Sequence, residues 1–233
     1  MNRLLMLLRW ETTVQFRQGI FYAAAFVAAV WVLMLYWIPE AGIKPVLVSI
    51  LFIDLGVFGF FFMPGLYFLE KNERVLEGLV VTPLRSWEYL IAKAVVLSVA
   101  AFAVGVAVTL LVYGAALNWL WFVIAMLAMS YPLSLLGFVI AARYNGINEY
   151  LVPGAFFLAI MQIPLLTFFD IVPGPLLYLL PSGPGMILLT ASFGDAPLWQ
   201  LIFALLYAAL LCVAGTRWAQ KALQQVVARQ VGS

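Results

Sequence analysis

The sequence predicts an all-α, polytopic membrane protein, and three observations lead to this fold class. The chain of 233 residues is 66% hydrophobic and only 9% charged, whereas a soluble domain carries about 25% charged residues. Its mean hydropathy is +1.09. The apolar residues fall into six runs, each near the ~20 residues that a membrane-spanning helix needs. The runs are 19–38, 45–69, 90–117, 119–142, 151–169 and 198–216, and we treat 1–233 as a single transmembrane domain.

The N-terminal residues 1–18 mix leucines and Trp10 with three arginines. A helix of this composition lies in the plane of the membrane interface, with its apolar face in the acyl region. We therefore expect an amphipathic interfacial helix that is not itself a span. At the other end of the chain, Ala222, Leu223, Val226 and Val227 recur at helical spacing. This pattern predicts that the last spanning helix continues beyond the apolar run.

The lysines and arginines predict the orientation of the spans. With the N-terminus inside, every Lys and Arg of the chain except Lys44 falls in a cytoplasmic segment. Positively charged residues of short loops are retained on the cytoplasmic side. We therefore expect both termini in the cytoplasm, as an even number of spans requires.

Residues 170–197, between the fifth and sixth runs, form an unusual external connection. The segment contains Pro173, Pro175, Pro181, Pro184 and Pro197, yet its other residues are mostly apolar. The pieces between the prolines are too short to span a bilayer, and proline interrupts helices. We expect broken interfacial or re-entrant helices, which serve either as a hydrophobic cap or as part of an exit gate.

Residues 70–88 concentrate charge between two apolar runs. Seven of the charged side chains of the chain lie here: Glu70, Lys71, Glu73, Arg74, Glu77, Arg85 and Glu88. From Glu70 to Val80 the apolar residues share one helical face. Thr82 suits an N-cap and Pro83 the first helical position, so a new helix is predicted to start at Pro83. The result is a helical elbow with an apolar ridge and charges on both of its arms.

The elbow resembles the signature of ABC-2-type transporter permeases. In that family an acidic and basic run after the second span precedes Leu-Glu-x-Leu, Thr-Pro, Glu-Tyr-Leu and a lysine. Here the matching residues are Leu76-Glu77-Gly78-Leu79, Thr82-Pro83, Glu88-Tyr89-Leu90 and Lys93. The chain departs from the family at Arg74-Val75, where many members have Gly-Thr. Small drug-export permeases of the fluoroquinolone-exporter type are the most similar subfamily.

The resemblance implies a function and a set of contacts. The equivalent stretch of the family is a coupling helix that docks into a separate ATPase subunit, and two permease chains form the pathway as a dimer in the bacterial cytoplasmic (inner) membrane. Carried over by position, the ATPase contacts are Glu70, Glu73, Arg74, Leu76, Glu77, Thr82 and Pro83. The alternative interpretation of the same residues is a solvated loop that only carries positive-inside charges.

The composition excludes several kinds of chemistry. The chain has no histidine and one cysteine, so catalytic triads and histidine or cysteine metal sites cannot be built from it. It has no GxxxxGK[ST] phosphate loop, and its net charge of +2 gives no reason to expect a nucleic-acid partner. We expect no enzymatic activity and no cofactor in this chain, and ATP and magnesium bound by the partner ATPase subunit.

Four side chains within the apolar runs are candidates for the pathway: Asp54, Phe61, Tyr67 and Gln162. A carboxylate inside a span is costly, so its default interpretation is functional. The structural alternative for Asp54 is a neutral, protonated side chain that is hydrogen-bonded to a neighbouring helix. For the aromatic rings the alternative is packing or contact with lipid. The sequence thus predicts the permease subunit of an ATP-driven exporter. The alternative is a non-transporting membrane partner, such as an immunity or assembly protein.

Overall fold

The computed structural model describes residues 3–75, 78, 85–172 and 175–231, and all regular structure in these residues is helical. The elements are α1 (Arg3–Arg17), α2 (Ile20–Leu35), α3 (Glu40–Asn72), α5 (Ser86–Val112), α6 (Trp119–Ala141), α7 (Ile147–Met161), α8 (Pro164–Phe168), the 3-10 helix η1 (Pro175–Leu179), α9 (Gly183–Phe193) and α10 (Leu198–Val231). The predicted all-α, polytopic fold class is confirmed.

The described residues contain five helical stretches that are long and apolar enough to cross a membrane. They are α3 from Gly42, α5, α6, α7 together with α8, and α10 to Ala228. A sixth crossing results if α1 and α2, which meet at an angle of 64°, count as one broken span. The bend lies at Gly19, whose φ of 82° is in the left-handed region that glycine adopts without steric cost.

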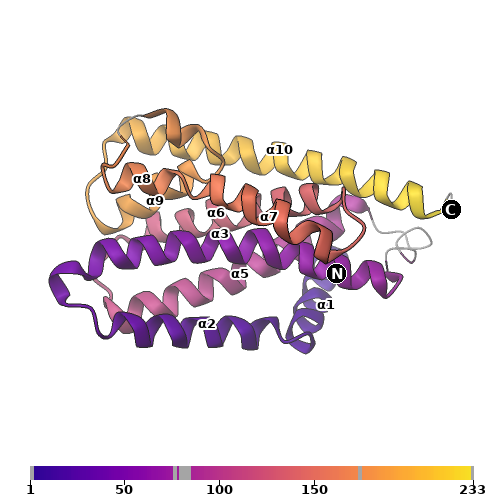
Figure 1. The fold of residues 1–233 in the computed structure, drawn as a ribbon, viewed down its shortest axis with the longest axis horizontal. Coiled ribbons are helices and arrows are strands. Elements are labelled where there is room, and N and C mark those ends of the chain that lie inside the picture. The colour runs from indigo at the N-terminus through magenta and orange to yellow at the C-terminus, as the bar shows by residue number, and fades with distance from the viewer. Residues whose placement is uncertain (1–2, 76–77, 79–84, 173–174, 232–233) are drawn as a thin grey trace.

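The helices run side by side along one axis (Figure 1). Both ends of the described chain lie at one end of this bundle, together with α1 and the C-terminal end of α3. The short helices α8 and α9 lie at the opposite end (Figure 1). The long C-terminal helix α10 continues past the apolar run that ends at residue 216, as the spacing of its apolar residues predicted.

Helix α6 is the centre of the bundle, since it packs against α3, α5, α9 and α10. Helix α6 approaches α3 closely at Gly137, where an added Cβ would lie 2.2 Å from the carbonyl oxygen of Phe60. That carbonyl has no helical donor, because the residue four positions later is Pro64, which has no N–H. The hydroxyl of Tyr150 in α7 donates to it instead, at 3.1 Å. One carbonyl oxygen therefore joins three helices.

The connection of residues 170–197 consists of broken helices, as the prolines predicted. Its helix α9 packs against α6 and α10, and almost all of its residues are buried. The hydroxyl of Ser182, just before α9, donates to the carbonyl of Met161 at the end of α7. The segment therefore closes one end of the bundle, and its depth in the membrane stays a prediction.

Candidate functional site

The candidate site is the elbow, and its first arm is the end of α3. The helix ends because Arg74 has a φ of 58°, the left-handed conformation that terminates helices. The N–H of Glu73 still donates to the carbonyl of Leu69, at 3.0 Å. Glu73, Arg74 and Val75 are exposed, so this tip presents charge of both signs and an apolar side chain.

The second arm begins later than predicted. Arg85 has extended backbone angles (φ −84°, ψ 138°), and α5 begins at Ser86, so the predicted helix start at Pro83 is wrong. The cause is Glu88, whose carboxylate accepts a hydrogen bond from the N–H of Arg85 at 3.0 Å and caps the helix there. Four predicted contact residues lie outside the described part of the chain: Leu76, Glu77, Thr82 and Pro83.

Glu70 differs from the other predicted contact residues, because it faces into the protein. It is only 6% exposed. Its carboxylate accepts a hydrogen bond from the Tyr89 hydroxyl and from the Lys93 ammonium, the latter at 2.6 Å. A side chain held in this way presents no surface to a soluble partner. Among the described residues, the exposed contact candidates are therefore Glu73 and Arg74.

The base of the elbow is also fixed to the next loop on the same side. The Nζ of Lys71 donates to the carbonyl oxygens of Tyr144 and Asn145, at 3.4 and 3.1 Å. These two residues lie between α6 and α7. The end of α3 is thereby joined to α5 through Glu70 and to the α6–α7 loop through Lys71.

Two of the pathway candidates, Asp54 and Gln162, are bonded to different neighbours. The carboxylate of Asp54 accepts a hydrogen bond from the indole N–H of Trp31 in α2, at 3.2 Å. Gln162 lies at the break between α7 and α8, and its amide donates to the carbonyl of Ile53 at 3.5 Å. A Cβ on Gly56 would lie 2.7 Å from that amide nitrogen. Gln162 therefore contacts the turn of α3 that carries Asp54, but the two side chains bond to different partners.

The two aromatic candidates also lie apart. Tyr67 is 1% exposed, and its ring stands perpendicular to that of Phe138 in α6, with centroids 5.1 Å apart. Phe61 is half-buried and lines a hollow of about 300 Å³ beside the α1–α2 bend. Its walls are Gln18, Ile20, Phe61, Phe62, Gly65, Leu66 and Leu69. Of the four candidates, only Phe61 borders this mainly apolar hollow.

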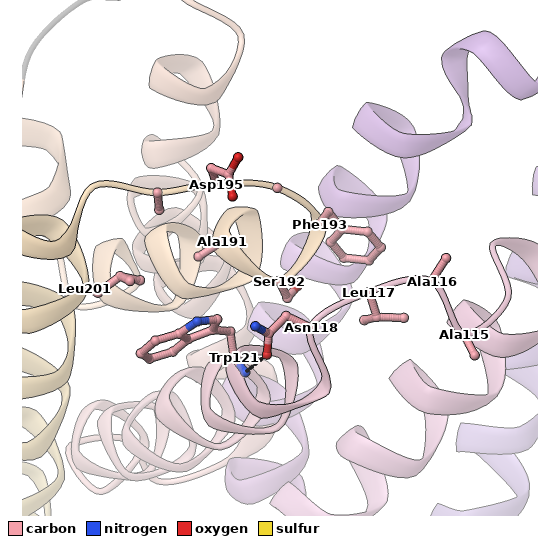
Figure 2. A pocket seen from close by; sticks show the side chains of 12 residues that line it. Ala115, Ala116, Leu117, Asn118, Trp121, Ala191, Ser192, Phe193, Asp195 and Leu201 are labelled. Carbon is pink, nitrogen blue, oxygen red and sulfur yellow. Dashed lines mark hydrogen bonds between the residues drawn. The ribbon is translucent and has the colours of Figure 1, made fainter.

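A larger cleft of about 650 Å³ lies at the opposite end of the bundle, between the α5–α6 and α9–α10 connections (Figure 2). Figure 2 shows Trp121 and Asn118 on one side and Asp195 across from them. The backbone N–H of Asn118 donates to the carbonyl of Ser192 at 2.8 Å and ties the α5–α6 connection to the end of α9. No group of three or more potential metal ligands occurs in the part of the chain that the structure describes.

The partners of the buried charges were not predicted from the sequence. Glu11 and Lys93 are 5% and 0% exposed, and Lys93 was assigned to the loop charges. A signal was available, since Lys93 falls inside the apolar run 90–117, where an ammonium group needs a counter-ion. Which carboxylate would meet it could not be predicted without the packing of the helices.

Comparisons with known proteins identify the family of this chain. The sequence profile of the fluoroquinolones export permease protein family matches residues 2–230. Two proteins named fluoroquinolones export permease protein, from the CDC 1551 / Oshkosh and ATCC 25618 / H37Rv strains of Mycobacterium tuberculosis, are each 35% identical over 227 residues. Each alignment covers 96% of this chain and 95% of the relative. The match extends over α1, the elbow and all the candidate spans, so this chain belongs to the fluoroquinolones export permease protein family.

Proposed function

We propose that this chain is the membrane-spanning subunit of an ATP-binding-cassette exporter. Two permease chains form the pathway, and a separate ATPase subunit binds the elbow of each. The observation that carries the proposal is the contrast between the last turn of α3 and the tip that follows it. Glu73 and Arg74 are exposed at the tip, while Glu70 is buried and bonded to α5. A soluble partner that binds this tip can displace the helices that follow it, because the base of the elbow is held by the ion pair of Glu70 with Lys93.

The energy source in this proposal lies outside the chain. ATP and magnesium bind to the ATPase subunit, since this sequence has no phosphate-binding loop. The distribution of lysine and arginine supports placing the elbow and both termini in the cytoplasm, with the protein in the bacterial inner membrane. The shared end of the bundle in Figure 1 is compatible with this orientation.

The proposed substrates are flat, aromatic, amphiphilic molecules of the fluoroquinolone class. This is the class that the names of the two relatives mention. The hollow beside Phe61 supports this class, because its two phenylalanine rings and single glutamine suit a planar ligand with few polar groups. In this proposal substrate enters near the hollow and leaves on the side of the cleft in Figure 2.

The test is co-purification of this chain with its ATPase subunit, followed by export of a fluorescent fluoroquinolone. Reversal of both tip charges, Glu73→Lys with Arg74→Glu, keeps the net charge and is expected to weaken ATPase binding about tenfold or more. The matched control is Glu40→Lys with Lys44→Glu, an exposed pair near the other end of α3. If the ATPase subunit binds the tip variant as well as the control, the elbow is not the docking site. If it does not bind the wild type either, the non-transporting membrane partner becomes the better account.

A further inference from the structure

Three charged side chains from three helices meet in a buried cluster behind the elbow. The ammonium of Lys93 in α5 lies 2.7 Å from a carboxylate oxygen of Glu11 in α1 and 2.6 Å from one of Glu70 in α3. Lys93 has no exposed surface, and each carboxylate side chain is 7% exposed. Charges removed from water in this way are stable only when they are paired.

Two further polar side chains complete this cluster. The amide of Gln15 donates to Glu11 at 2.9 Å, and the Tyr89 hydroxyl donates to Glu70. The ammonium of Lys93 also lies 5.1 Å from the centre of the Tyr89 ring, within the range of a cation–π contact. The cluster thus holds two anions around one cation, and Lys93 is the group that keeps the two carboxylates together.

Helix α1 contributes two side chains to this cluster. Glu11 and Gln15 are the buried residues of α1, and both belong to it. Among its apolar side chains, Leu5, Met6, Trp10 and Phe16 are about half or more exposed. Four others are only half-buried: Leu4, Leu7, Leu8 and Val14. The fully buried contacts of α1 are therefore polar, and the chain continues from α1 through the bend at Gly19 into α2.

We infer that Glu11, Lys93 and Glu70 are positioning residues that couple α1 to the two helices flanking the elbow. Glu70 lies three residues before Glu73, and Lys93 lies two turns into α5, the helix that follows the elbow. A displacement of the elbow therefore displaces both Glu70 and Lys93. Lys93 passes this movement to Glu11 and, through α1 and Gly19, to α2. The source of the displacement rests on the proposed function, whereas the attachment of α1 does not.

Inverting the charges of the cluster distinguishes a role of ion pairing from a role of side-chain packing. Lys93→Glu alone places three carboxylates together and is expected to release α1. Adding Glu11→Lys and Glu70→Lys gives one anion between two cations, which restores the pairing. Gln15 can then offer its amide oxygen and Tyr89 its hydroxyl oxygen as acceptors. A third variant, Glu11→Gln with Glu70→Gln and Lys93→Met, removes all charge while keeping similar volumes. Lys221→Met, on the exposed side of α10, is the control for loss of one lysine.

The measurements are made on the full chain with its ATPase subunit in lipid. A spin label at Thr13→Cys, in a Cys212→Ala background, reports the mobility of α1, and export of a fluorescent fluoroquinolone is measured per ATP hydrolysed. The uncharged variant is expected to purify in normal amounts with a mobile α1 and at least about fivefold less export per ATP. The full inversion is expected to return both values close to those of the wild type.

Either of two results would overturn the inference. One is an α1 that stays as immobile in the uncharged variant as in the wild type, or stays mobile in the full inversion. The other is a mobile α1 with unchanged export per ATP, which would show that the attachment does not transmit movement. Absence of ATPase binding to the wild type is a separate result, because it contradicts the proposed function and leaves the label measurement valid.

Discussion

The indole N–H of Trp31 donates a hydrogen bond to the carboxylate of Asp54, 3.2 Å away, and so joins α2 to α3. Asp54 is 9% exposed and lies in the middle of an apolar run. Its side chain therefore has a hydrogen-bond partner on a neighbouring helix. The bond does not exclude a role in transport, because a carboxylate has further acceptor positions.

Asp54→Asn and Trp31→Phe separate the two roles of this pair. The asparagine keeps an oxygen for Trp31 but loses the charge, whereas the phenylalanine removes the donor and leaves the carboxylate. If Asp54 takes part in transport, Asp54→Asn lowers export several-fold with little loss of stability. Trp31→Phe is expected to lower the free energy of unfolding by about 1 kcal/mol, because the hydrogen bond is lost. Export is measured with a fluorescent fluoroquinolone. Normal export by Asp54→Asn would show that the residue is structural.

Tyr150→Phe tests the hydrogen bond to the carbonyl of Phe60. The carbonyl then loses its donor in an apolar environment, and we expect the free energy of unfolding to fall by about 0.6–1.5 kcal/mol. The effect should shrink when Pro64→Ala supplies a helical N–H to the same carbonyl. Unfolding in detergent can be followed by the reaction of the single cysteine, Cys212, with a thiol dye. Tyr113→Phe is the control, and equal losses in both variants would contradict the assignment.

Gly137→Ala tests the close approach of α6 to α3. An added Cβ would lie 2.2 Å from the carbonyl oxygen of Phe60, so the helices must separate, at a cost of about 1–3 kcal/mol. Gly65→Ala in α3 is the matched control, since nothing lies within 4 Å of its Cβ. That variant is expected to be neutral or slightly more stable, because alanine favours helix. Similar thermal midpoints for the two variants would mean that α3 and α6 are not packed this closely.

Arg74 lies in a backbone conformation that suits glycine. Its φ is 58°, and a side chain in the left-handed region costs about 1–2 kcal/mol. Arg74→Gly is therefore expected to be more stable than Arg74→Ala by about 1 kcal/mol. Both variants lose the guanidinium, so the comparison isolates the backbone, and the same thiol-dye assay measures it. A more stable alanine variant would show that α3 does not end at this residue.

The sequence was sufficient for the fold class because membrane insertion depends on local features, namely apolar length and the placement of charge. The broken helices around residues 170–197 were predicted from their prolines. The sequence also showed that Arg74 stands where many family members have glycine, and the positive φ of Arg74 explains why glycine suits this position. The start of α5 was predicted too early, because the capping carboxylate of Glu88 outweighed the Thr82-Pro83 signal.

The partners of buried groups could not be predicted from the sequence. Lys93 is separated from Glu11 by 82 positions and from Glu70 by 23, and only the packing of α1, α3 and α5 brings them together. The same holds for Trp31 with Asp54 and for Tyr150 with the Phe60 carbonyl. Hydrophobic periodicity identifies which face of a helix is buried, but it does not state which helix covers that face.

The position of Lys93 in the chain also has a consequence for biogenesis. Glu11 and Glu70 leave the ribosome before the lysine that pairs with both, so neither carboxylate can enter its final environment when its own helix is made. Helix α1 must therefore stay at the membrane surface until α5, which carries Lys93, has been inserted. Assembly of this half of the protein is then a late, concerted step, and nascent chains that stop before residue 93 should keep α1 accessible to protease.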